Sequence, residues 1–180
     1  RTNGQQCDVI GLATKTDPNQ GAKVMTLFTV DCELEGFNRG RNLDKMGLHS
    51  GDTSELFFDD LRVSVDSILG GEGLGFANMM NELPRERLIL GVGCVGAAQG
   101  ALDLTVDYVK ERMAFGQSVV DFQNTRSKLA EMKTDIELSR AMAEKYTARF
   151  IAGDLSSAEA SMLKLASSEM QGRIVDQCVQ

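Results

Sequence analysis

Glu86 is the side chain in this sequence whose neighbours best suit it for acid–base chemistry. It stands between Arg85 and Arg87, in a stretch that reads as helix and that also contains Pro84. A carboxylate becomes a useful proton acceptor when its surroundings are dry, because desolvation disfavours its charged form. On the residues alone, an exposed carboxylate paired with its arginines is the favoured interpretation, and such a pair contributes under about 1 kcal/mol. The segment therefore has a structural and a chemical interpretation.

A second segment, residues 112–117 (RMAFGQ), offers an anion-binding side chain. The planar guanidinium of Arg112 suits phosphate because it can bind two oxygens as a fork. The segment also reads as a helix end, with Gly116 at the C′ position and Arg112 beside the negative end of the helix dipole. The two interpretations are compatible.

The elements that must position these residues change character near residue 70. Residues 24–30 and 55–63 are rich in strand-forming side chains, and residues 17–21 (DPNQG) carry the signature of a hairpin turn. Glycines crowd residues 70–75, and apolar residues recur at helical spacing from there on. Ser156 and Glu159 predict an N-cap and capping box. We therefore expect an α+β fold, with strands over residues 1–70 and about three or four long helices over residues 71–180.

Residues 91–96 contain the pattern G-x-G-x-x-G, which is also the fingerprint of a dinucleotide-binding loop. That loop requires a strand before it and a second strand after its helix. The residues on both sides of this pattern instead favour one continuous helix. The glycines are better explained by close helix packing than by a nicotinamide site.

Composition restricts the class of protein. The net charge of −7 argues against a nucleic-acid binder, which needs clustered Lys and Arg. No uninterrupted run of 18 apolar residues occurs, so no membrane span is expected. With a single histidine and no C-x-x-C pair, no metal site is expected either. The four cysteines lie far apart in the sequence, which favours reduced thiols over disulfides. They are Cys7, Cys32, Cys94 and Cys178.

Taken together, the Pro84–Arg87 and 112–117 segments and the helical sequence between them resemble the acyl-CoA dehydrogenase family, and the resemblance extends over nearly all of the chain. It implies the middle of a longer enzyme: a partial β-barrel-like middle domain over residues 1–70, then an incomplete C-terminal helical bundle over residues 71–180. Glu86-Arg87 matches the Glu-Arg pair of the long-chain and isovaleryl-type branch, where the glutamate is the catalytic base. Arg87 is then a substrate-side residue, and Pro84 and Arg85 occupy neighbouring positions that contact acyl-CoA in relatives.

The same resemblance implies bound FAD. The segment 112–117 matches the family's Arg-x-x-Phe-Gly, whose arginine reaches the pyrophosphate of FAD in a neighbouring subunit. The threonine of a Thr-Asn-Gly sequence, here Thr2-Asn3-Gly4, bonds the flavin ring in relatives. The residues expected at FAD are Thr2, Arg112, Ala114, Phe115, Phe122 and Gln123.

The implied reaction is removal of an α-proton with transfer of a β-hydride to FAD, which gives a trans-2-enoyl-CoA and passes electrons to an electron-transferring flavoprotein. A homodimer or homotetramer is expected. Its subunits would bury part of an apolar face formed by Leu88, Val92, Val95, Leu102 and Val106. The compartment would be a bacterial cytoplasm or a mitochondrial matrix. Alternatives are a non-catalytic fragment of such an enzyme, an oxygen-using acyl-CoA oxidase, and the less favoured nicotinamide enzyme.

Overall fold

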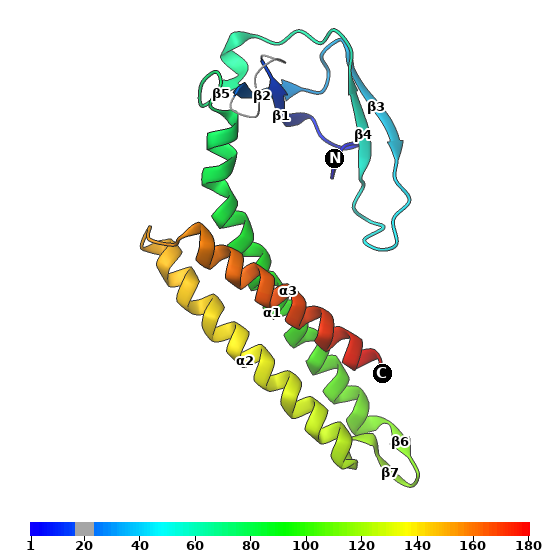
Figure 1. Cartoon of the computed structure of the whole chain (residues 1–180). Coiled ribbons are helices and arrows are strands. Elements are labelled where there is room, and N and C mark those ends of the chain that lie inside the picture. Colours follow the sequence, from blue (N-terminus) through cyan, green and yellow to red (C-terminus); the bar gives the residue numbers. More distant parts are fainter. Residues whose placement is uncertain (17–23) are drawn as a thin grey trace. The chain divides into compact units, whose positions relative to one another are not determined.

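The computed structural model describes residues 1–16 and 24–180, in two compact units, Arg1–Met80 and Asn81–Gln180. The first unit is built mainly of strands and the second of helices, so the α+β prediction is confirmed (Figure 1). The hairpin turn expected at residues 17–21 lies outside the described residues.

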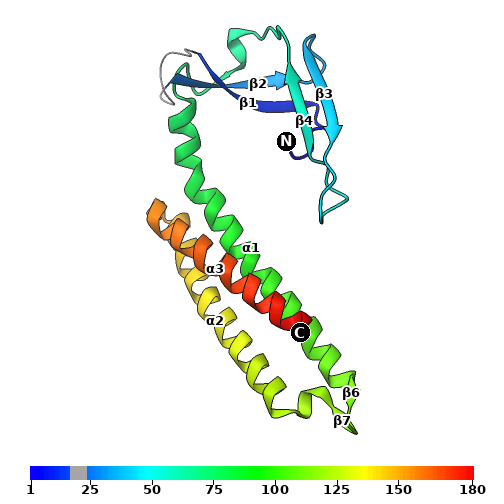
Figure 2. The same ribbon diagram turned by 45° about the vertical axis from the view of Figure 1, so that its right-hand side comes forward.

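The strands of the first unit form two small antiparallel sheets (Figure 2). One sheet has the order β1-β2-β5, and its strands are β1 (Val9–Lys15), β2 (Met25–Asp31) and β5 (Ile68–Leu69). The other pairs β3 (Phe37–Asn42) with β4 (Ser54–Phe58), and a short 3₁₀ helix, η2 (Val65–Ser67), follows β4. The strands expected at residues 24–30 and 55–63 correspond to β2 and β4, although β4 ends at Phe58. Strand β3 was not predicted, because its sequence, FNRGRN, is almost entirely polar.

The core of this unit is small. Its fully buried apolar side chains are those of Ile10, Val30 and Cys32, with partly buried residues packed around them. The first turns of α1 (Gly75–Glu111) stay attached to β2. The Gly73 N–H donates to Thr26 Oγ1 at 2.9 Å, and a Cβ at Gly75 would lie 2.8 Å from the Met25 carbonyl oxygen. These contacts explain why the first unit continues to Met80, past the change in sequence character at residue 70.

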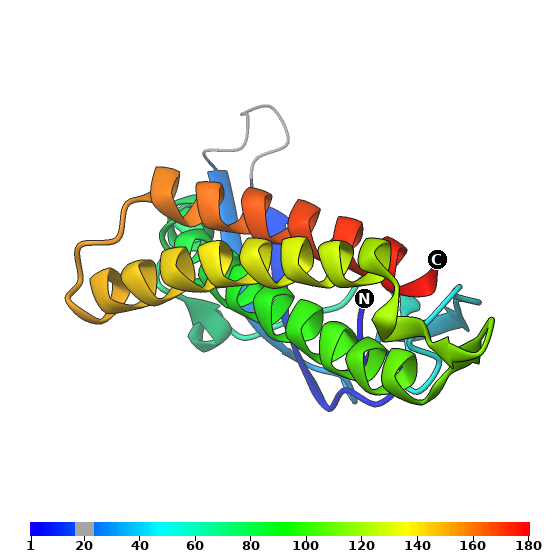
Figure 3. The ribbon, with the colours of Figure 1, turned by 90° about the horizontal axis from the view of Figure 1, so that it is seen from below.

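The second unit is a bundle of α1, α2 (Gln123–Ile151) and α3 (Ser157–Val179), which run side by side (Figure 3). A small hairpin, β6 (Met113–Ala114) and β7 (Gln117–Ser118), and a 3₁₀ helix, η3 (Val119–Asp121), connect α1 to α2. The capping box at Ser156 and Glu159 is present at the start of α3, as the sequence predicts. Gly153, at φ 78°, ends α2 in the left-handed conformation that favours glycine.

One face of each helix fills a common core. Its buried residues are Leu88, Val95, Ala98, Leu102, Met132, Ile136, Ala143, Tyr146, Leu163, Met170 and Ile174. The apolar face expected to meet a second copy must therefore be corrected for three of its five residues. Leu88, Val95 and Leu102 are buried inside this chain, because α2 and α3 return to cover them, whereas Val92 is 44% exposed. Helical spacing identified an apolar face but not its partner.

The glycine pattern at residues 91–96 lies entirely within α1, so the loop required by a dinucleotide site does not form. Only one of the three glycines matters for packing between helices. A Cβ at Gly91 would lie 2.6 Å from Leu163 Cγ on α3, whereas Gly93 and Gly96 face open space. The packing explanation is confirmed for Gly91 alone.

Helix α1 bears on the expectation that the chain has no membrane span, but it does not overturn that expectation. Among the described residues, it is the one helix that is long and apolar enough to cross a membrane by length and composition. The helix contains no uninterrupted apolar run of 18 residues, because polar residues interrupt its sequence. The finding is weak support for a span, since core helices pass the same test.

Candidate active site

The carboxylate of Glu86 lies on the exposed side of α1, away from the helical core. Successive helix residues are about 100° apart, so Glu86 and the buried Leu88 point to opposite sides. Leu90, one turn after Glu86, shares its face and is 55% exposed. The Glu86 carboxylate therefore lies beside an apolar side chain, that of Leu90, on an exposed face of the helix.

Each arginine beside Glu86 has another partner. Arg85 Nη1 lies 3.5 Å from Glu82 Oε2, an exposed pair three residues apart on the helix. Within residues 1–16 and 24–180, Glu86 itself takes part in no ion pair. Glu86 is exposed, as the structural interpretation requires, but it is not ion-paired. This leaves a carboxylate that a ligand could reach.

Arg87 joins α1 to the start of α3. Its Nη1 donates to Ser161 Oγ at 2.9 Å and lies 3.4 Å from Ser157 Oγ. The side chain is half-buried, so α3 holds it in place. Both contacts use Nη1, and among the described residues they are the hydrogen bonds that Arg87 makes through its side chain.

Pro84 lies inside α1, where it cannot donate to the carbonyl of Met80. That carbonyl is therefore not used by the helix ladder. Pro84 is half-buried, next to the exposed Arg85. The helix continues through this position into Glu86 and Arg87.

Arg112 directly follows the end of α1, but the residues after it form a hairpin, so the expected C′ role of Gly116 is wrong. α1 ends at Glu111, Met113 pairs with Ser118, and Ala114 pairs with Gln117. The two turn residues have positive φ, 52° for Phe115 and 81° for Gly116, as a type I′ turn requires. The strand pairing directly after the helix displaced the C-cap that the glycine suggested.

Ser118 ends α1 in place of Gly116. Its hydroxyl donates to the Val109 carbonyl at 2.8 Å and lies 2.9 Å from the Lys110 carbonyl. These are two of the last four carbonyls of the helix, which have no partner within it. Sequence reasoning missed Ser118, because a serine seven residues past the helix end carries no local signal for a cap.

Phe115 has an unfavourable backbone conformation, and its side chain is exposed to solvent. A left-handed φ in a residue other than Gly, Asn or Asp is uncommon and costs on the order of 1–3 kcal/mol. Its ring is 98% exposed and packs edge-on against Phe122, with centroids 6.4 Å apart. Strain of this kind at a displayed aromatic residue is typical of a binding site.

The start of α2 suits an anion. Phe122 is the N-cap and supplies no side-chain hydrogen bond, and the first turn, which begins at Gln123, contains no acidic residue. The free amides there carry the positive end of the helix dipole. Arg112 and Gln123 are both exposed in this connection, and Asp121 is its one acidic residue. These features fit the pyrophosphate of a dinucleotide such as FAD.

Thr2 lies in the other unit, on a turn anchored to β4. It forms an isolated bridge with Thr53, and the Asn3 N–H donates to the Asp52 carbonyl at 3.0 Å. The Asp52 carboxylate accepts the Gln5 N–H at 2.6 Å and is buried. This anchoring leaves Thr2 exposed beside the strand. Thr2 belongs to the first unit, whereas Glu86 and Arg112 belong to the second.

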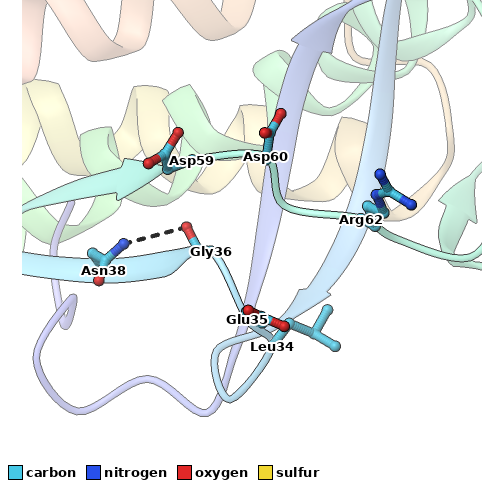
Figure 4. Close-up of a pocket in the computed structure, with 7 residues that line it drawn as sticks. All are labelled: Leu34, Glu35, Gly36, Asn38, Asp59, Asp60 and Arg62. Atoms are coloured by element: carbon cyan, nitrogen blue, oxygen red, sulfur yellow. Dashed lines mark hydrogen bonds between the residues drawn. The ribbon is translucent and has the colours of Figure 1, made fainter.

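A hollow of about 510 Å³ in the first unit lies where no site residue was expected (Figure 4). Its lining includes Glu35, Asp59 and Asp60, with Arg62 as the one base. Gly36, at φ 94°, is required there because a Cβ would lie 2.2 Å from the Asp59 carbonyl oxygen. The excess of carboxylates makes this hollow unsuitable for the phosphates of FAD or CoA. The described residues also contain no group of three or more His, Cys, Asp or Glu side chains placed to hold a metal ion.

Comparison with known proteins places these features in a family. The family model described as "Acyl-CoA dehydrogenase, C-terminal domain" matches residues 73–180. A mitochondrial long-chain specific acyl-CoA dehydrogenase of Sus scrofa is 40% identical over 99% of this chain and 42% of its own length.

Solved structures agree. An acyl-CoA dehydrogenase from Geobacillus kaustophilus superposes with a TM-score of 0.97 at 40% identity, over 99% of this chain and 48% of that one. A prolyl acyl carrier protein oxidase gives a TM-score of 0.89 at 27% identity, over 98% of this chain and 48% of that one. The chain thus spans less than half the length of these relatives. It belongs to the acyl-CoA dehydrogenase family.

Proposed function

We propose that this chain is part of an FAD-dependent acyl-CoA dehydrogenase in which Glu86 is the catalytic base. The observation that carries the proposal is the exposed Glu86 carboxylate, which has no ion-pair partner among the described residues although arginines flank it. Neighbouring residues on a helix do not face each other, so each arginine can take another partner. Here Arg85 pairs with Glu82 and Arg87 bonds to serines, so Glu86 is left for a ligand.

Glu86 would remove the α-proton of an acyl-CoA thioester and hold it on a carboxyl oxygen. FAD, when bound, supplies the acceptor for the hydride that leaves the β-carbon. Loss of the proton and the hydride leaves a trans double bond between the two carbons, as in a 2-enoyl-CoA. An acyl chain lying over Leu90 would exclude water from the same helix face and make the carboxylate a stronger base.

Arg87 and its neighbours would position the substrate. The bonds from Arg87 to Ser157 and Ser161 fix the guanidinium while they occupy only Nη1. Nε and Nη2 would then remain available to the substrate. Pro84 and the exposed Arg85 would contact the acyl-CoA from the preceding turn.

The connection between α1 and α2 would hold FAD. Arg112 would bind the pyrophosphate of the FAD in a second copy of the chain, which makes a homodimer or homotetramer part of the proposal. Ala114, Phe115, Phe122 and Gln123 would border the same group. Thr2 would bond the flavin ring from the first unit. The strained, exposed Phe115 and the α2 start without acidic residues support this assignment.

The proposed substrate class and electron acceptor rest on the resemblance to this branch. A Glu-Arg pair at residues 86–87 favours a linear long-chain or a branched short-chain acyl group, with an electron-transferring flavoprotein as acceptor. The whole protein would work in a bacterial cytoplasm or a mitochondrial matrix. The similarity to a prolyl acyl carrier protein oxidase favours one second candidate, an oxidase that passes electrons to oxygen.

Replacing Glu86 with Gln in the complete protein tests the proposal. The substitution keeps the shape and removes the proton acceptor, so acyl-CoA-dependent bleaching of the flavin should slow by about 10²–10⁴-fold. FAD content should stay unchanged. The matched control is Glu82→Gln, one turn earlier on α1, which should keep near-normal rates because that carboxylate only pairs with Arg85. Arg112→Ala should show the reverse pattern, with FAD lost.

Normal turnover in Glu86→Gln would place the base elsewhere and contradict the proposal. Peroxide produced from acyl-CoA without a flavoprotein acceptor would identify the oxidase. Complete protein that purifies without flavin and binds none would favour a non-catalytic role.

A further inference from the structure

Two thiols that are distant in the sequence lie against each other in the first unit. Cys7 lies two residues before the start of β1 and Cys32 directly follows β2, so the pairing of these strands brings them together. Their Sγ atoms are 3.5 Å apart. The Cys32 N–H donates to the Asp8 carbonyl at 2.8 Å, which fixes the backbone next to Cys7. Neither thiol has a role in the proposed dehydrogenation.

The two thiols differ in what can reach them. Cys32 is only 3% exposed and belongs to the small core, whereas Cys7 is half-buried at its edge. Burial raises the pKa of the Cys32 thiol to about 11, and the hydrogen bond with Cys7 adds to this effect. Cys32 therefore stays protonated and protected, and Cys7 is the sulfur that a small reagent meets first.

We propose that Cys7 and Cys32 form a redox modification site, at which a hydroperoxide converts the two thiols into a reversible disulfide. In the first step Cys7 sulfur attacks the peroxide oxygen, breaks the O–O bond and becomes a sulfenic acid, while the other oxygen leaves as water. In the second step Cys32 sulfur attacks Cys7 sulfur, the Cys32 thiol proton passes to the sulfenic oxygen, and that oxygen leaves as a second water. Two thiols lose two electrons in total, and one hydrogen peroxide is reduced to two waters.

The geometry requires little movement. A disulfide needs its sulfurs about 2.05 Å apart, and rotation of the half-buried Cys7 side chain can shorten the present 3.5 Å. The bond would tie the segment before β1 to the end of β2. The other two cysteines provide a contrast, because Cys94 lies on α1 and Cys178 on α3, where the Cys178 thiol contacts Met132 Sδ at 3.9 Å.

Oxidation would also remove a hydrogen bond from the turn that carries Thr2. The Cys7 thiol donates to the Gly4 carbonyl at 3.4 Å, and the disulfide removes that donor. Gly4 is buried against β4, where a Cβ would lie 3.1 Å from Ser54 Cβ. The effect on flavin binding rests on the proposed function, but formation of the disulfide does not.

The test uses protein carrying Cys94→Ser and Cys178→Ser, which leaves only the pair. After hydrogen peroxide and then N-ethylmaleimide in denaturant, the intact mass should fall by two hydrogens with no maleimide added. Dithiothreitol should restore two reactive thiols. Trypsin should release one linked species that joins residues 2–15 to residues 24–39. Oxidation should raise the melting temperature by roughly 5–10 °C. Two maleimide adducts after peroxide, or links only between chains, would overturn the proposal.

Single substitutions separate the roles of the two sulfurs. With Cys7→Ser added, Cys32 should resist peroxide, and with Cys32→Ser added, Cys7 should stop at sulfenic or more highly oxidised acids. Because Cys32 is buried and its variant can fail to fold, phenylarsine oxide on the unsubstituted protein gives a second measurement. One arsenical should block alkylation of Cys7 and Cys32 together and leave Cys94 and Cys178 reactive. Unprotected Cys7 and Cys32 would also contradict the proposal.

Discussion

The two units of this chain bury their apolar side chains to different extents. The helical unit, from Asn81 to Gln180, has a shared core of 11 buried residues contributed by all three helices. Among its described residues, the β unit buries three in its core and leaves Val9, Phe57 and Phe58 between 39% and 55% exposed. Helices satisfy their own backbone and need only a neighbour for one face, whereas two small sheets leave open edges and faces. We infer that most of the stability of this chain lies in the helical unit.

This difference matters for the proposed chemistry. Glu86, Arg112 and Gln123 are presented by the unit with the larger core, and Thr2 by the smaller one. A catalytic base benefits from a rigid element, because a small displacement of a catalytic group lowers the rate strongly. The oxidisable pair, Cys7 and Cys32, lies in the unit with the smaller core, where a disulfide would add relatively more stability.

The largest effect on stability is expected from breaking the helical core. Leu163→Ala removes a side chain that is fully buried between helices and should lower the free energy of unfolding by about 2–5 kcal/mol. Chemical denaturation followed by far-ultraviolet circular dichroism measures this change. The control is Leu165→Ala on the same helix, at a side chain 57% exposed, where about 0.5 kcal/mol or less is expected. Equal effects of the two substitutions would contradict the division between core and surface.

A smaller effect is expected from separating α1 and α3. Gly91→Ala would place a Cβ 2.6 Å from Leu163 Cγ, so overpacking should cost about 1–3 kcal/mol. Gly93→Ala is the matched control, since its Cβ would meet open space and alanine favours a helix by about 1 kcal/mol. The two substitutions, two residues apart, should shift the denaturation midpoint in opposite directions. A gain in stability from Gly91→Ala would mean that the helices do not approach closely there.

The smallest effect is expected at the cap of α3. Ser156→Ala should cost about 1 kcal/mol, because it removes the side-chain acceptor for the Glu159 N–H, 3.2 Å away. Ser168→Ala, in the interior of the same helix, is the control and should be nearly neutral. Thermal denaturation of the helical signal measures both.

The cap should also depend on pH. Hydrogen bonds from the Ser156 hydroxyl and backbone hold the pKa of Glu159 below its ordinary value of 4.5. A lowered carboxyl pKa stabilises the fold above the ordinary value, and this contribution is lost as the pH falls through the lowered one. The difference between wild type and Ser156→Ala should therefore shrink as the pH is lowered from neutral to below 4.5. A difference that grows in acid would show that the Glu159 carboxylate does not support the cap.

Local signals in the sequence were sufficient for some elements. Ser156 and Glu159 predicted the start of α3, because a capping box involves only residues three apart. Strand β2 and the helices also followed from residue type and spacing. Strand β3 did not, since its polar sequence pairs with β4 through backbone hydrogen bonds that leave no mark on its composition.

The candidate site shows the same division. A carboxylate between two arginines, and an arginine before Phe115-Gly116, could be read from the chain directly. Gly116 was wrongly expected to end a helix, because a glycine with positive φ serves a C′ position and a type I′ turn equally well. Only the pairing of Met113 with Ser118 distinguishes the two. Ser118 could not have been identified as the cap before that pairing was known.

What the sequence by itself determined is therefore the kind of element and the chemical groups it carries: strands, then long helices, with Glu86 on a helix and Arg112 near a helix end. Tertiary structure decided which face of α1 is buried and which partner each arginine takes. It also placed Cys7 beside Cys32 across 25 residues. The physical reason is that helical and strand periodicity are local properties of the backbone. The neighbours of a side chain depend on how distant segments pack, and no short stretch of sequence encodes that.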